Sequence, residues 1–151
     1  MKLITMNRKI KKIIVHCAAT PPSMDIGVDT IRKWHVEDRK WSDIGYHYVI
    51  RLDGSIEIGR PISRQGAHTK GYNKESVGIC YVGGVNEKGD AEDTRTDEQK
   101  KSLKILLEFL KLTFPDSVIH GHRDFANKAC PSFDAVEEYK HIITQNDENN
   151  V

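Results

Sequence analysis

The chain has 151 residues, of which 30% are charged, and its formal net charge is +1. That length suits one domain and allows a hydrophobic core that needs no disulfide bonds. No basic stripe or acidic tract stands out, so we expect no nucleic-acid partner. No segment has the ~20 apolar residues of a membrane span, and the first residues lack the apolar run of a signal peptide. We therefore expect a monomer that is made in the cytoplasm and does not insert into a membrane.

The three cysteines limit the kinds of site that the chain can form. Cys17, Cys80 and Cys130 are far apart and odd in number, and no C-x-x-C pair is present. This spacing excludes a zinc ribbon and a thioredoxin motif, and it disfavours a disulfide framework. A reducing compartment of synthesis follows. We expect Cys17, which alternates with His16 along a strand, and Cys80, in an apolar run, to be core residues.

The first half of the chain predicts a strand, a helix and a hairpin. Residues 11–17 are apolar and β-branched, as in a buried strand, and a turn-rich segment follows them. Residues 29–40 predict a helix with one apolar face. Residues 44–60 predict a hairpin that turns at Asp53-Gly54. His16 thus lies at the carboxyl end of a strand, where open sheets often place their chemistry.

The second half predicts a polar loop over residues 65–76, a central strand over 77–84 and a surface loop over 85–95. The strongest helix signal covers residues 96–114, with a capping box of Thr96 and Gln99. A short strand over 117–121 and a last helix over 133–143, with a second capping box at Asp134 and Glu137, complete the pattern. We expect one α/β domain over residues 1–142, with a mixed central β-sheet flanked by about three helices. Residues 143–151 are predicted to be a polar tail that frays.

One loop gathers residues that bind metals. His122 and Cys130 are separated by seven residues, and imidazole with thiolate suits zinc better than magnesium or calcium. His16 is the leading candidate for a third ligand, which would leave one position of a tetrahedral zinc open for water, as in catalytic sites. Alternatives remain for each residue alone. His16 is about as often a hydrogen-bonded strand-end histidine, and Cys130 is more often a small buried apolar residue.

Several long blocks in order carry a resemblance to a known family. They include "IIVHCAAT", "WSDIGYHYVI", "DGSIEIGR", "GAHTKGYNKESVGIC" and "KACPSFD". From about residue 13 to residue 139 the chain resembles the zinc-dependent N-acetylmuramoyl-L-alanine amidases of the phage lysozyme and peptidoglycan recognition protein family. The resemblance implies one zinc ion held by His16, His122 and Cys130. It also implies Tyr46 as the tyrosine essential for hydrolysis and Lys128 as the lysine of the lytic, phage-like branch.

The implied reaction cleaves the amide between N-acetylmuramic acid and L-alanine in peptidoglycan, on the cell wall after release of the enzyme. Lys128 can stabilise the oxyanion of the tetrahedral intermediate, and Tyr46 can donate a hydrogen bond or move a proton. No H-E-x-x-H motif is present, so these two residues share work that the sequence leaves undivided. A recognition module that has lost hydrolysis is the alternative, but all three predicted ligands, Tyr46 and Lys128 are present. Inhibition of an RNA polymerase, known for a phage member, would need a surface that the sequence does not identify.

Weaker expectations concern the substrate. We expect His68, Asn73 and Trp41 to bind it, although Asn73 is also suited to hold its own loop and Trp41 to pack. His35 and His47 are predicted to be structural. The segment before Trp41 departs from the family pattern, because it is one residue longer and has Lys40 where relatives have a glycine that would suit a left-handed helix cap.

Overall fold

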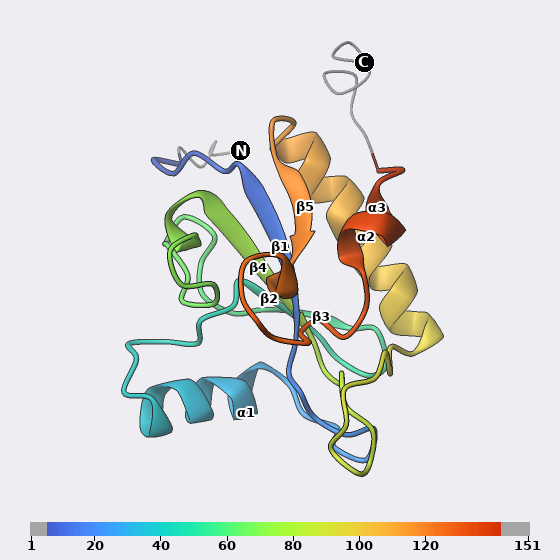
Figure 1. The fold of residues 1–151 in the computed structure, drawn as a ribbon. Helices are drawn as coiled ribbons and strands as arrows, with labels where there is room; N and C mark the ends of the chain where they lie inside the picture. Colours follow the sequence, from blue (N-terminus) through green and yellow to red (C-terminus); the bar gives the residue numbers. More distant parts are fainter. Residues whose placement is uncertain (1–5, 143–151) are drawn as a thin grey trace.

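The computed structural model describes residues 6–142, so the predicted tail lies outside the described residues. A five-stranded sheet forms the centre, with the strand order β3-β2-β4-β1-β5 (Figure 1). Strand β3 is antiparallel to β2, and the other neighbouring pairs are parallel. This mixed sheet confirms the predicted α/β class. The strands are β1 (Lys12–Cys17), β2 (Tyr48–Ile50), β3 (Ile56–Ile58), β4 (Ser76–Tyr81) and β5 (Val118–Gly121).

Three α-helices flank the sheet: α1 (Val28–Lys33), α2 (Asp97–Thr113) and α3 (Ala135–Tyr139). The predicted capping box begins α2, because Thr96 Oγ1 accepts from Gln99 N at 3.1 Å and Gln99 Oε1 accepts from Thr96 N at 2.9 Å. At α3 only half of the predicted box forms, with Asp134 accepting from Glu137 N at 3.1 Å. This helix ends earlier than predicted. No helix in the described part of the chain is long and apolar enough to cross a membrane.

Each face of the sheet packs against its own helices. The face that includes Val15 and Cys17 contributes to a core with α2 and α3, whereas Cys80 belongs to a smaller core with α1. Figure 1 shows α2 and α3 together, with α1 away from them. Alternation along β1 therefore turns His16 away from the α2 face. Both Cys17, 6% exposed, and Cys80, fully buried, are core residues as predicted.

The predicted helix over residues 29–40 changes its winding part-way. After α1 the chain forms a π-helix, Trp34–Asp38, and Arg39 N donates to Trp34 O at 3.2 Å, five residues back. A π-helical turn holds about one more residue than an α-helical turn, so this winding would accommodate the extra residue expected from the sequence. Lys40 then adopts the left-handed backbone with φ 61°, the conformation that a glycine takes most easily.

Candidate metal centre

Parallel pairing of β1 and β5 brings two histidines to the same edge of the sheet. Val15 pairs with Gly121 at the end of the ladder, and the next residue in each segment is a histidine. The rings of His16 and His122 lie 4.6 Å apart, centroid to centroid. Their proximity thus follows from the register of the two strands.

Cys130 reaches the same point from the loop after β5. Its Sγ lies 3.8 Å from His16 Nδ1, and Cys17 N donates to Sγ at 3.2 Å. The base of the loop is closed by Arg123 N, which donates to Cys130 O at 2.8 Å. Backbone N–H groups therefore hold both the sulfur and the carbonyl oxygen of Cys130.

The three donor atoms suit a zinc ion. One nitrogen from each histidine and the sulfur of Cys130 all lie within 4.8 Å of one another. Zinc bonds of 2.0–2.3 Å to nitrogen and sulfur require tetrahedral donors to be roughly 3.3–3.8 Å apart, so a small inward movement would complete the coordination. Burial lowers the pKa of His16 well below its usual value, and nearby His68 lowers it further. Neutral imidazole is the form that binds metals.

His68 holds the ring of His16, the predicted first ligand, by a side-chain contact. His16 Nε2 lies 2.9 Å from His68 Nδ1, and His68 Nε2 lies 3.3 Å from Ser76 Oγ. A metal at His16 Nδ1 would require the arrangement in which His16 Nε2–H donates to His68 Nδ1 and His68 Nε2–H donates to Ser76 Oγ. His16 Nδ1 is then left unprotonated on the side of Cys130. In metal sites, a hydrogen bond from the ring nitrogen that does not bind the metal fixes the tautomer of the histidine.

Gly78 makes room for this arrangement. A Cβ at Gly78, in β4, would lie 2.5 Å from His68 Cδ2 and 2.6 Å from His68 Cγ. Such distances are far below the ordinary contact between carbon atoms. The His68 ring therefore occupies the space that any larger residue at position 78 would fill.

Tyr46 lies beside His16. The two ring centroids are 5.1 Å apart. Burial raises the pKa of Tyr46 well above its usual value, with the neighbouring cysteines adding to the shift. The side chain is therefore a phenol that can donate a hydrogen bond.

Lys128 lies on the groove beside His122. This groove has a volume of about 670 Å³, and its lining includes Trp41, His68 and Asn73. Burial lowers the pKa of His122, and the charge of Lys128 lowers it further. Asp124, an acidic residue of the same loop, accepts from Gly121 N at 2.8 Å. The ammonium group thus faces the groove without an ion pair in the described part of the chain.

The predicted substrate residues have different surroundings. Asn73 Oδ1 accepts from His68 N and Thr69 N, both at 2.9 Å, so it fastens its own loop as the alternative expectation held. Trp41 packs against His35, with ring centroids 4.6 Å apart. Both side chains also line the groove.

The sequence of this chain matches a known family over most of its length. A family model described as N-acetylmuramoyl-L-alanine amidase matches residues 6–133. The chain belongs to this family. It is 48% identical over 130 residues to an endolysin of Enterobacteria phage K11, a match that covers 86% of this chain and 85% of the relative. It is 47% identical over 122 residues to the endolysin of Escherichia phage T7, covering 81% and 80%.

Solved structures agree with this assignment. The N-acetylmuramoyl-L-alanine amidase LysC from Clostridium intestinale is 28% identical, with a TM-score of 0.75, covering 99% of this chain and 91% of that one. Drosophila PGRP-LB is 25% identical, with a TM-score of 0.74, covering 92% and 85%. The single mixed-sheet domain of this amidase is therefore the fold of its relatives.

Two other histidines of the amidase are structural, as predicted. His47 is 1% exposed, and its Nδ1 accepts from Gly78 N at 3.0 Å while its Nε2–H donates to Arg64 O at 2.8 Å. His35 Nδ1 accepts from Gly45 N at 2.8 Å. Burial is the largest cause that lowers the pKa of each to about 4.

Two features of the amidase site were not predicted from the sequence. One is the contact of His68 with His16, which depends on how a loop folds over β4. The other is a second hollow of about 370 Å³, lined in part by Tyr46, Trp34 and Arg39. The unusual length of the segment before Trp41 was the only available signal for this hollow.

Proposed function

We propose that the amidase uses one zinc ion, held by His16, His122 and Cys130, to hydrolyse the amide between N-acetylmuramic acid and L-alanine in bacterial peptidoglycan. The chain is a peptidoglycan amidase by family, and the observation that supports this mechanism is the convergence of two imidazoles and one thiol beside an open groove. When bound, zinc would supply Lewis acidity and lower the pKa of a coordinated water to about 7.

The chain's own residues divide the remaining work by position. Lys128 lies in the groove on the His122 side, where a compact positive charge stabilises the oxyanion of a tetrahedral intermediate. Tyr46 lies on the His16 side, where its hydroxyl can donate a proton to the leaving amine. We propose these separate roles because Tyr46 lies against His16, whereas Lys128 lines the groove together with His122.

A recognition module without hydrolysis is not favoured. Such a module needs the groove but no reactive centre, whereas here all three donors, Tyr46 and Lys128 are present around one point. We further propose that the protein acts as a monomer on the cell wall, which light scattering of the purified protein would check.

Digestion of purified cell walls tests the proposal. Mass analysis of the products should find free stem peptides that begin with L-alanine, and a chelator should stop their release. His122→Ala should lose both zinc, measured by elemental analysis, and activity. His120→Ala is the matched control, because His120 lies two residues before His122, in β5, but contacts Phe125 and Asp124. Full activity in a verified metal-free preparation would refute the zinc mechanism.

A further inference from the structure

The segment between the π-helix and Trp41 holds an arginine in a defined position. The guanidinium carbon of Arg39 lies 5.2 Å from the centre of the Trp41 ring. The backbone beneath it is fastened by two hydrogen bonds, from Arg39 N to Trp34 O at 3.2 Å and from Trp41 N to His35 O at 3.0 Å. Stacking on an aromatic face restricts a guanidinium and leaves its N–H groups free to bind a ligand at their edge.

Arg39 has no acidic partner within residues 6–142. The carboxylate of the adjacent Asp38 lines the same hollow but forms no ion pair with it. The neighbouring groove has Lys70 and Lys128 in its lining and no acidic side chain among its described residues. Asp38 reduces the general positive field of the hollow, so an anion there would depend on direct contact with the guanidinium fork.

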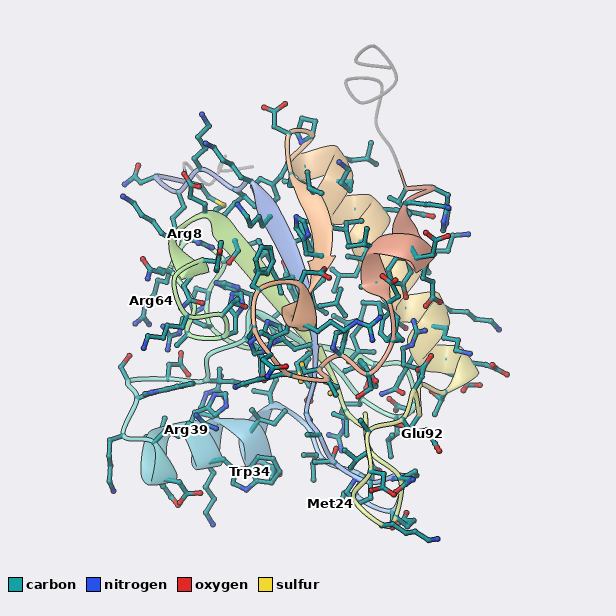
Figure 2. The ribbon with its side chains drawn as sticks, in the orientation of Figure 1. Arg8, Met24, Trp34, Arg39, Arg64 and Glu92 are labelled. Carbon is teal, nitrogen blue, oxygen red and sulfur yellow. The ribbon has the colours of Figure 1, made fainter. Side chains whose placement is uncertain are left out.

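The hollow opens beside the reaction centre. Arg39 lines it together with Tyr46, whose ring lies 5.1 Å from that of His16. Its volume of about 370 Å³ is at the small end for ligand pockets, which suits a short part of a substrate. Figure 2 labels Arg39 and Trp34 on the helical segment that borders it.

The chemistry of a muramyl peptide limits which free carboxylate can lie near the scissile amide. The lactyl carboxyl group is used up in the scissile amide, and L-alanine carries no charged side chain. The nearest free carboxylate is the α-carboxylate of the second stem residue, a glutamate joined to the next residue through its γ-carboxyl group. We propose that Arg39 is a specificity-determining residue that binds this α-carboxylate in the hollow beside Tyr46. This inference rests on the proposed amidase function.

Two substrates and three variants test it. The substrates are muramyl tripeptides that differ only at the second residue, which carries either the free α-carboxylate or a carboxamide. Arg39→Gln removes both the positive charge and the paired N–H donors of the guanidinium, and Arg39→Lys keeps the charge alone. Lys33→Gln is the matched control, because Lys33 is an exposed cation on the same helical segment that does not line the hollow.

The expected result is a loss confined to one substrate. Arg39→Gln should lower kcat/KM for the carboxylate substrate by roughly 10- to 100-fold, mainly through KM, and leave the carboxamide substrate unchanged. Arg39→Lys should recover only part of this loss, and Lys33→Gln should match the wild type on both substrates. An unchanged ratio of carboxylate to carboxamide turnover in Arg39→Gln would overturn the assignment. Failure of the amidase function itself would differ, because the wild type would then release no peptide from either substrate.

Discussion

Substitution of Gly78 tests whether His68 orients His16 as a proposed zinc ligand. In Gly78→Ala the new methyl group would lie 2.5 Å from His68 Cδ2, so the ring must move by roughly 1 Å to restore ordinary contact. The hydrogen bond of 2.9 Å between His68 Nδ1 and His16 Nε2 would then break or lengthen. Loss of such a partner typically weakens metal binding by about 10- to 100-fold. Overpacking should also lower the free energy of unfolding by about 1–3 kcal/mol.

A competition titration with a zinc chelator measures the effect. His68→Ala should weaken zinc binding by a similar factor, because it removes the same partner directly. The double variant Gly78→Ala/His68→Ala should bind zinc no more weakly than His68→Ala alone, since the methyl group then meets no ring. If Gly78→Ala binds zinc with wild-type affinity while remaining folded, the orienting role of His68 is wrong.

Three further predictions concern catalysis and pH. Tyr46→Phe should retain zinc and fold but lose most turnover, and wild-type digestion rates would contradict its role. Lys128→Ala should lower kcat by ~10²–10³ with little change in KM, as measured by steady-state kinetics beside the groove-lining control Lys70→Ala. His35 and His47 are neutral in the fold, with pKa values of about 4 against a usual 6.5. Their stabilising effect is complete above about pH 6.5 and is lost as the pH falls toward 4, on the order of 2 kcal/mol for each by pH 5. Urea unfolding at pH 7 and pH 5 should show this loss, and it should shrink in His47→Gln.

Local signals predicted much of the fold. The β-branched run of β1 and the Thr96 capping box are local, and both were located within a residue or two. The hairpin was predicted in place, but its paired strands are only three residues each, since strand ends depend on neighbours rather than on propensity. The π-helix was not predicted, because a single added residue leaves the apolar pattern of a helix almost unchanged.

Site residues that lie close together in the sequence were predicted more easily than those that only the fold brings together. His122 and Cys130 share one loop, so their spacing pointed to a metal, and His16 was a candidate from its place at a strand end. The position of His68 behind His16 required the register of β4 and the absence of a side chain at Gly78. Arg39 was not predicted because its significance arises from the Trp41 ring beneath it and from the hollow that the fold creates.

The loop that carries Cys130 also carries Lys128, and this links metal binding to the position of the lysine. His16 and His122 are set by strand pairing, whereas Cys130 and the ammonium group two residues before it depend on one loop closed at Arg123. Binding of metal to the sulfur would therefore also restrict where the lysine can be. Metal occupancy and the position of the Lys128 charge would then be coupled, so that a change in the loop remote from either side chain would alter both together.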